Sequence, residues 1–336
     1  MGLLRSCSEG TSGALHQFSI RNFGCAYKDD VKTVRPRSSG RKIRGGTGTC
    51  TTTAGLQTFG AKRIFSKFEP FLSRWALTPD GDPIVTRGAR LLPVRHLGEA
   101  AMLKIALDHD EEVGGLVMAW WDGQGAARVL ALEGNAILLE RAEGTRSLSD
   151  YARDGRDDEA TRILCDAIGR LHAPRAAPPP GLVPLPVWFN ALEPASQAHG
   201  GILKQSAEVA CLLLADPRDG VVLHGDIHHD NVLDFGKRGW LAIDPKRIHG
   251  ERGFDYANLF CNPDVESPVH RVAVLPDRFA SRLAIVCQQA GLDRRRLLQW
   301  IVAWAGLSAA WYIEDGETPA VDFEIARLAL AELDLG

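Results

Sequence analysis

The sequence of 336 residues predicts an α+β fold in two lobes, a small β-rich N-lobe and a larger helical C-lobe. Short apolar runs bounded by turn residues dominate the stretch from residue 63 to residue 142, which is typical of strands. From residue 143 onward the apolar positions recur at helical spacing, as in the set 163, 164, 167, 168 and 171. We therefore take residues 63–142 and 143–336 as the two lobes.

Residues 1–62 have a different composition. They hold ten Lys and Arg against three Asp and Glu, a formal charge of +7, whereas the remainder of the chain carries −10. They also hold 24 Gly, Ser and Thr and no lasting apolar period. Such a segment buries too little apolar surface to offset the entropy of ordering it. We expect a disordered basic extension, for which a misplaced start site is an alternative explanation.

The N-lobe is predicted to contain several strands and one helix. The strand segments are residues 75–85, which include a Pro-Asp-Gly turn, 88–96, 100–107 and the hairpin within 128–144. Residues 110–121 predict a helix, because acidic side chains open it and apolar ones follow. Gly114 and Gly115 weaken that helix. The lobe ends near Ala142.

The C-lobe is predicted to be mostly helical. Its helices are expected at residues 147–152, with a Ser cap, 157–173, 202–214 and most of 277–334, and a proline-rich loop at 173–186 separates two of them. One of the longest uncharged runs, residues 297–313, has 17 residues. A membrane span needs about 20 apolar residues, so we expect a buried core helix in which Trp300, Trp304 and Trp311 pack.

Composition also excludes several classes of function. The net charge of −3 argues against a dedicated nucleic-acid binder. The seven cysteines include no C-x-x-C pair, and the first twenty residues lack an apolar signal core. These features favour free thiols in a cytoplasmic protein.

The segment from residue 221 to residue 245 carries the side chains suited to chemistry. An apolar strand leads to His224-Gly225-Asp226, and Asn231 follows five residues after the aspartate. A catalytic Asp followed after four residues by a metal-binding Asn is the spacing of the kinase catalytic loop. This spacing predicts that Asp226 acts as the base for a substrate hydroxyl and that Asn231 binds Mg²⁺.

A second metal ligand is expected beyond a short hairpin. Residues 232–233 and 241–243 predict that hairpin, and Asp244 ends it. A carboxamide and a carboxylate at one edge suit Mg²⁺, which shares substrate phosphates and keeps waters. The triplet Asp234-Phe235-Gly236 spells the metal-binding D-F-G of kinases, but no hairpin fits between it and Asn231. We therefore assign Asp234 to the strand or turn and Asp244 to the metal.

With these motifs the chain resembles a known family. HGDIHHDN at residues 224–231 resembles the H-G-D-x-H-x-x-N loop of aminoglycoside phosphotransferases, which share a bilobal protein-kinase-like fold. WWDGQGAARVL, ILLERAEG, RLHAP and GERGFDYANLF follow in order, and the chain is similar over residues 72–334 to the streptomycin 6-phosphotransferases of the aminoglycoside/hydroxyurea resistance kinases. The resemblance implies ATP- and Mg²⁺-dependent phosphorylation of the 6-hydroxyl of streptomycin, with no nucleic acid, membrane or obligate protein partner.

ATP requires further groups. Lys104 is a charge inside an apolar strand, where a kinase lysine contacts the α- and β-phosphates, although a lysine on an edge strand is an alternative reading. Its helical partner would be Glu111 or Glu112. The resemblance implies that backbone groups from Glu140 to Ala142 meet the adenine. In the absence of a G-x-G-x-x-G sequence, we expect the turn at residues 86–90 to cover the phosphates.

Other polar residues are expected to have structural or substrate-facing roles. We expect His224 to support the catalytic loop and Asp255, at a helix start, to anchor it. His228 and His229 lack the spacing of a zinc site. The negative charge of the chain beyond residue 62 is compatible with an acidic cleft for a cationic substrate, although each acidic side chain taken alone is more typical of a solvated surface; the residues concerned are Glu251, Glu314, Asp315 and Glu317.

Three alternatives stay open or are disfavoured. A kinase of the same fold acting on another small alcohol or on hydroxyurea fits the same residues. A protein kinase is disfavoured because no A-P-E-like segment or long activation loop fits between Asp244 and Asp255. A non-catalytic nucleotide-binding module would be expected to lack Asp226, Asn231 or Asp244, and all three are present.

Overall fold

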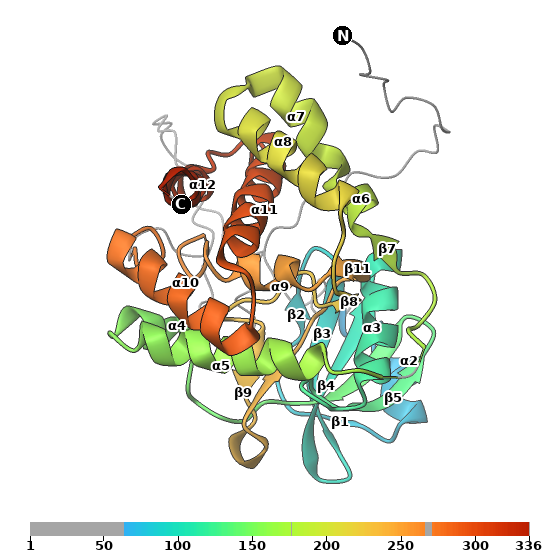
Figure 1. Ribbon diagram of the computed structural model, residues 1–336. Helices are drawn as coiled ribbons and strands as arrows, with labels where there is room; N and C mark the ends of the chain where they lie inside the picture. The colour runs from blue at the N-terminus through green and yellow to red at the C-terminus, as the bar shows by residue number, and fades with distance from the viewer. Residues whose placement is uncertain (1–63, 176, 266–270, 336) are drawn as a thin grey trace, which may run out of the picture.

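The computed structural model describes residues 64–175, 177–265 and 271–335, and in this part the two predicted lobes are present (Figure 1). The N-lobe is a sheet with a helix on each face, and the C-lobe is built mainly from helices. The expectation for residues 1–62 lies outside the described residues. None of the helices in the described part is long and apolar enough to cross a membrane.

The N-lobe sheet is antiparallel, with the strand order β1-β3-β4-β6-β5 and with β2 also paired to β3. This lobe consists of α2 (Glu69–Arg74), β1 (Thr78–Pro79), β2 (Ile84–Val85), β3 (Ala89–His96), β4 (Glu99–Ala106), α3 (His109–Trp121), β5 (Val129–Glu133) and β6 (Ala136–Glu140). The strands predicted at 88–96 and 100–107, the hairpin and the helix are therefore confirmed.

The first predicted strand pair is arranged differently from the expectation. β1 and β2 do not pair with each other; Thr78 lies opposite Arg95 and Ile84 lies opposite Leu91, so both extend along the same edge of β3. Pro79 and Pro83 flank the interruption. Because proline has no N–H to donate to a strand ladder, Pro79 and Pro83 limit these two short strands at the edge of the sheet.

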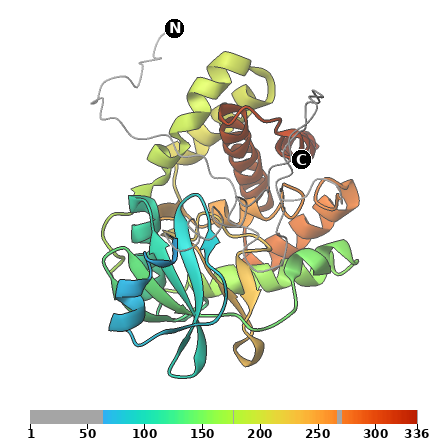
Figure 2. The same ribbon diagram turned by 180° about the vertical axis from the view of Figure 1, so that it is seen from behind.

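The two faces of the N-lobe sheet are covered by different helices. Alternate side chains of β4, including Leu103 and Ile105, pack with Phe68 and the region of α2. Successive side chains of a strand point to opposite faces. Lys104 therefore points to the other face, which α3 covers (Figures 1 and 2).

The C-lobe is assembled around α11 (Arg294–Glu314), which packs against α8, α9 and α12. Trp300 and Trp304 are buried, and Trp311 contacts the Trp188 ring edge-on at 5.9 Å, so the expected core helix is confirmed. The other helices are α4 (Leu148–Arg153), α5 (Asp157–Leu171), α6 (Leu185–Trp188), α7 (Leu192–His199), α8 (Gly201–Ala215), α9 (Gly253–Asn258), α10 (Pro276–Ala290) and α12 (Ala320–Asp334).

The described part of the chain also contains two small sheets besides the N-lobe sheet. One is the predicted hairpin of β9 (Val232–Asp234) and β10 (Trp240–Ala242). The other has the order β7-β11-β8, in which β11 (Ile248–Glu251) lies between β8 (Gly220–Leu223) and β7 (Val183–Pro184). β7 and β11 were not predicted.

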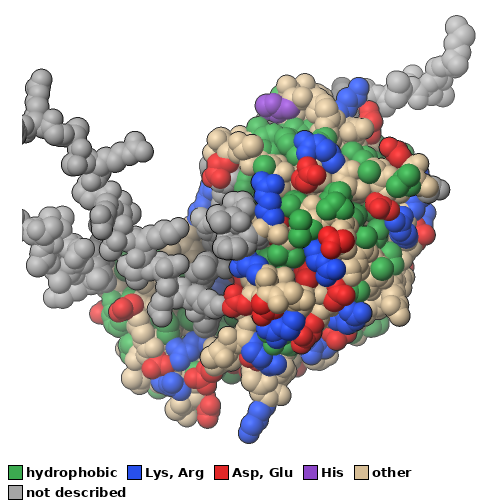
Figure 3. All heavy atoms as spheres, turned by 90° about the vertical axis from the view of Figure 1, so that its left-hand side faces the viewer, with side chains coloured by type: hydrophobic (Ala, Val, Ile, Leu, Met, Phe, Trp, Pro, Cys, Tyr) green, Lys and Arg blue, Asp and Glu red, His purple; other side chains and the backbone are tan. Residues whose placement is uncertain are grey.

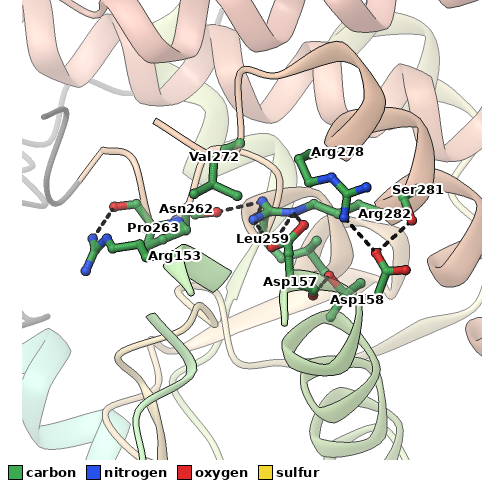
Figure 4. A network of polar contacts seen from close by, with 12 residues as sticks. Arg153, Asp157, Asp158, Leu259, Asn262, Pro263, Val272, Arg278, Ser281 and Arg282 are labelled. Atoms are coloured by element: carbon green, nitrogen blue, oxygen red, sulfur yellow. Dashed lines mark hydrogen bonds and ion pairs between the residues drawn. The ribbon is translucent and has the colours of Figure 1, made fainter. Parts of the chain in front are cut away.

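A buried ion pair joins α5, α10 and the segment after α9 (Figure 4). The Arg282 guanidinium is fully buried and donates to Asp157, with Nε 3.0 Å from Oδ2 and Nη2 2.5 Å from Oδ1. It also donates to the carbonyls of Leu259 and Asn262 at 2.9 and 2.6 Å. These hydrogen bonds replace contacts with water that burial removed, and they fix the position of the chain just beyond α9.

Candidate active site

The predicted catalytic loop begins where β8 ends. Gly225 has a φ of +81°, and a Cβ there would lie 2.5 Å from the Cδ1 atom of Ile248, so only glycine fits this turn. Asp255 on α9 anchors the loop, as expected, because its carboxylate accepts the backbone N–H groups of His224 and Gly225, each at 2.8 Å. The same carboxylate contacts Nε2 of His172 at 2.8 Å.

His224 supports the loop from within. Its Nδ1 accepts the backbone N–H of Asp226 at 3.3 Å, and its Nε2 donates to the carbonyl of Ile243 at 2.8 Å. Burial lowers the pKa of His224 against the opposing charges of Asp255 and Asp226, which favours the neutral ring that these contacts require. The imidazole thus connects the catalytic loop to the segment before Asp244.

Asp226 lies at the centre of the site with its carboxylate oriented by neighbouring side chains. The Nδ2 of Asn258 donates to Oδ1 at 3.4 Å, and Nε2 of His228 lies 4.0 Å from the same oxygen. Asn262 donates from its own Nδ2 to Oδ1 of Asn258 at 3.0 Å. Because the Asn262 carbonyl is held by Arg282, a polar chain connects Asp226 to the buried core of the C-lobe.

The register of the β9–β10 hairpin separates the two candidate metal aspartates. Val232 pairs with Ala242, and the Ile243 N–H donates to the Asn231 carbonyl at 3.0 Å, so Asn231 and Asp244 lie at the open end. Asp234 pairs with Trp240 at the turn end.

Asp234 forms an ion pair with Arg146. Its carboxylate accepts two hydrogen bonds of 2.8 Å from the Arg146 guanidinium. Hydrogen bonding to Arg146 lowers the pKa of Asp234 to about 2. The geometry therefore agrees with a structural role for the aspartate of the literal D-F-G triplet.

The open end of the hairpin offers two oxygens suited to Mg²⁺. Oδ1 of Asn231 and Oδ2 of Asp244 are buried and have no hydrogen-bond partner, whereas Nδ2 of Asn231 donates to the Asp226 carbonyl at 2.8 Å and thereby fixes which way the amide faces. A buried acceptor without a partner is costly, and a cation would satisfy it. In the described ranges no three His, Cys, Asp or Glu side chains group as metal ligands. Mg²⁺ typically takes one or two protein ligands and shares substrate phosphates and waters.

Asp244 is strained and ionised. Its φ of 61° is left-handed, a conformation that residues other than glycine adopt mainly where the surroundings impose it. Burial raises the pKa of this carboxyl, but the charges of Lys104 and Lys246 outweigh burial and lower it to about 2. The carboxylate is therefore available as a ligand at neutral pH.

Lys104 connects the N-lobe to this cluster. Its ammonium contacts Asp244 and lies 2.5 Å from Oε2 of Glu111. Burial disfavours the charged form, but Asp244 and Glu111 outweigh it and raise the pKa of Lys104. Of the two predicted helical partners, Glu111 makes the contact, whereas the Glu112 side chain is 45% exposed.

Gly114 allows α3 to approach this closely. A Cβ at Gly114 would lie 2.5 Å from the carbonyl oxygen of Pro245, so any larger residue would push the helix away from the segment after β10. The same displacement would move Glu111 away from Lys104. The glycine that weakens the helix in isolation is thus required by its packing.

Lys246 is a site residue that the sequence did not predict. This lysine is buried, with 6% of its surface exposed, and its ammonium lies within 4 Å of carboxylates from Glu111, Asp226 and Asp244. Its position two residues after Asp244 was the only available signal, and a lysine next to an arginine in a loop is more typical of a solvated surface.

The roles expected for Glu140 to Ala142 at the adenine and for residues 86–90 at the phosphates stay predictions. The Glu140 carboxylate is itself engaged, since it accepts the Arg128 N–H at 2.6 Å and contacts Arg238. Ala142 follows in the irregular segment between β6 and α4. Residues 86–90 contain the turn between β2 and β3.

The expected acidic cleft is wrong for Glu251. This side chain is buried and accepts hydrogen bonds from the Arg296 guanidinium at 2.6 and 2.9 Å and from Nε1 of Trp300 at 2.7 Å. Its carboxylate is paired with Arg296 and Trp300 inside the C-lobe, so it is not available to contact a substrate. On the face shown in Figure 3, acidic and basic side chains are interspersed.

The fold and the matching sequence define the class. Residues 74–316 match the aminoglycoside/hydroxyurea antibiotic resistance kinases, and the chain belongs to this family. A solved structure of a thermostable mutant of an aminoglycoside phosphotransferase, in ternary complex with ADP and hygromycin B, has the same protein-kinase-like fold. Its TM-score is 0.52 at 13% identity, over 80% of this chain and 97% of that one.

Individual relatives are more similar in sequence. The chain is 51% identical over 267 residues to streptomycin 3''-kinase from Klebsiella pneumoniae, which covers 78% of this chain and 100% of the relative. It is 31% identical over 271 residues to streptomycin 6-kinase from Streptomyces griseus, covering 76% and 85%. The expected similarity to 6-phosphotransferases is therefore present, but it is the weaker of these two.

Proposed function

We propose that the chain is an ATP- and Mg²⁺-dependent kinase that phosphorylates streptomycin at its 3''-hydroxyl. The observation that carries the chemistry is the convergence of Asp226, Asn231 and Asp244, with Lys104, at one buried site between the lobes. The acceptor follows from the relatives. The match to a streptomycin 3''-kinase has 51% identity and spans that protein entirely, so it supports the 3''-hydroxyl over the 6-hydroxyl expected from sequence.

Each site residue would have a separate role in phosphoryl transfer. The Lys104 ammonium would hold the α- and β-phosphates of ATP, and the oxygens of Asn231 and Asp244 that accept no hydrogen bond would hold Mg²⁺. A Mg²⁺ ion held there would neutralise part of the negative charge of the ATP phosphates. Asp226 would orient the acceptor hydroxyl and take its proton as the acceptor oxygen bonds to the γ-phosphorus, while the bond to the β–γ bridging oxygen breaks and ADP leaves.

An acceptor panel tests this proposal. Purified full-length protein with ATP and Mg²⁺ would be given streptomycin, hydroxyurea or an aminoglycoside without guanidinium groups, and ADP release would be followed. Coupled ³¹P–¹H NMR would then locate the phosphate on the product. We expect rapid turnover with streptomycin alone and a phosphate on the 3''-oxygen. Turnover restricted to hydroxyurea would overturn the acceptor, and a phosphate on the 6-oxygen would overturn the position.

A further inference from the structure

A second lysine occupies the centre of the candidate active site. The Lys246 ammonium lies 3.8 Å from Oε1 of Glu111, 3.8 Å from Oδ2 of Asp226 and 3.9 Å from Oδ2 of Asp244. These three distances are nearly equal, so the ammonium stands between the carboxylates of the proposed base and the proposed metal ligand. Lys104, by contrast, is drawn closely to Glu111 and Asp244.

The backbone fixes Lys246 in this place. Its N–H donates to the carbonyl of His224 at 2.7 Å, which ties it to the residue that opens the catalytic loop. The preceding Pro245 contacts α3 at Gly114. The cation is thus positioned by both lobes and by the catalytic loop, which is the kind of support that a group acting on substrate requires.

The location defines the group that the ammonium would meet. In an in-line transfer, the γ-phosphoryl passes from the metal-bound phosphates to the hydroxyl held by the base, and its equatorial oxygens carry the charge of the transition state. The gap between Asp226 and Asp244 is where that transfer would occur. A fixed cation aimed at developing charge is among the strongest catalytic devices in a site shielded from water.

We propose that Lys246 is a catalytic residue that contacts the γ-phosphoryl group during transfer, whereas Lys104 contacts the α- and β-phosphates. This inference rests on the proposed phosphotransferase function. The ammonium keeps its proton throughout; the bond to the β–γ bridging oxygen breaks, the bond to the acceptor oxygen forms, and the acceptor proton goes to Asp226.

A purely structural role makes a different prediction. If Lys246 only offset the charge of three carboxylates, its removal would lower stability and would weaken binding of every nucleotide to the same degree. If it contacts the γ-phosphoryl, its removal would discriminate between nucleotides that have this group and those that do not. Binding measurements therefore separate the two roles without any turnover.

The experiment compares Lys246→Met with wild type by calorimetric titration of AMP-PNP and of ADP, each with Mg²⁺. We expect the affinity for AMP-PNP to fall by about tenfold or more while the affinity for ADP changes less than about twofold. Turnover with streptomycin should fall by about 10²–10³, the effect of removing one donor to a developing anion. Lys104→Met should weaken binding of both nucleotides. Arg247→Met removes a neighbouring cation that pairs with Asp110, and it should not discriminate between them.

Two results would overturn the inference. Equal losses for AMP-PNP and ADP would show that Lys246 has only the structural role, and unchanged affinities together with unchanged turnover would show that it has neither. Should Lys246→Met fail to fold, as judged by its melting temperature, Lys246→Gln is titrated in the same way and decides on the same criterion. A wild-type protein that binds AMP-PNP but does not phosphorylate streptomycin would refute the proposed acceptor and leave the nucleotide test of Lys246 valid.

Discussion

Asp234 and Asp244 form a matched pair for testing the site, because they lie near opposite ends of the same hairpin. Asparagine is the substitution of choice at both positions, since it removes the charge, keeps the size and tolerates the left-handed φ of 61° at Asp244. We expect Asp244→Asn to remove turnover and Asp234→Asn to lower stability while turnover persists.

The stability effect at Asp234 follows from its pKa. The shift of the Asp234 pKa from 3.8 to about 2 corresponds to about 2 kcal/mol in the free energy of unfolding. We reduce this contribution to about 1–2 kcal/mol because the Arg146 side chain is 49% exposed and water screens its charge. The pKa is lowered in the folded state, so this stabilisation is fully present above pH 3.8 and is lost as the pH falls through about 2. At neutral pH, Asp234→Asn should therefore lower the Tm by a few degrees, at about 2–4 °C per kcal/mol.

The effect at Asp244 is on chemistry. Loss of a metal ligand that also faces Lys104 removes several kcal/mol of charge stabilisation, so we expect turnover to fall by at least about 10³ at any practical Mg²⁺ concentration. Scanning calorimetry and ADP release across a Mg²⁺ titration measure both variants. The opposite pattern, with an active Asp244→Asn and an inactive but folded Asp234→Asn, would refute the assignment and place the metal at the literal D-F-G triplet.

Three further predictions concern the loop and its support. Asp226→Asn should lower transfer to streptomycin by about 10²–10⁴ while calorimetry finds ATP affinity unchanged; lost ATP affinity would place Asp226 in the metal site instead. Asp157→Ala leaves the Arg282 guanidinium buried without its partner and should destabilise the fold by about 3–5 kcal/mol in denaturant titrations, and a loss under about 1 kcal/mol would contradict that role. Gly225→Ala forces a Cβ to 2.5 Å from Ile248 at positive φ and should lower the Tm together with turnover, whereas a variant with wild-type values of both would disprove the close approach.

Much of the candidate site was predictable from sequence because its geometry is local. The spacing between Asp226 and Asn231 lies within one loop, and a short hairpin brings Asp244 back to that loop whatever surrounds it. The apolar neighbours of Lys104 placed it within a strand, and strand alternation then determined which face it points to. These inferences need only backbone periodicity and residue chemistry.

The parts that were missed depend on contacts between distant segments. Glu251 is buried because Arg296, 45 residues later, supplies its partner, and nothing near Glu251 in the sequence indicates that. Lys246 is buried because α3 packs against the segment after β10. Likewise, β1 and β2 both pair with β3 instead of with each other, since the ladder of β3 offers both of them a better partner than a proline-interrupted hairpin.

The acceptor position could not be read from the site residues either. The groups that move the phosphoryl are the same for any hydroxyl, so the loop from His224 to Asn231 predicts the reaction but not its regiochemistry. The proposal of the 3''-hydroxyl over the 6-hydroxyl rests instead on the comparison with whole relatives.

The central claim, transfer of the γ-phosphoryl of ATP to streptomycin at the Asp226 site, is tested most directly by mass spectrometry with γ-¹⁸O-labelled ATP. Full-length protein, Mg²⁺ and streptomycin are incubated, and Asp226→Asn is carried through the same procedure. The account predicts streptomycin that has gained one labelled phosphoryl group with the wild type, and about 10²–10⁴ less of it with the variant. Unmodified streptomycin accompanied by labelled inorganic phosphate, or equal product from both proteins, would contradict it.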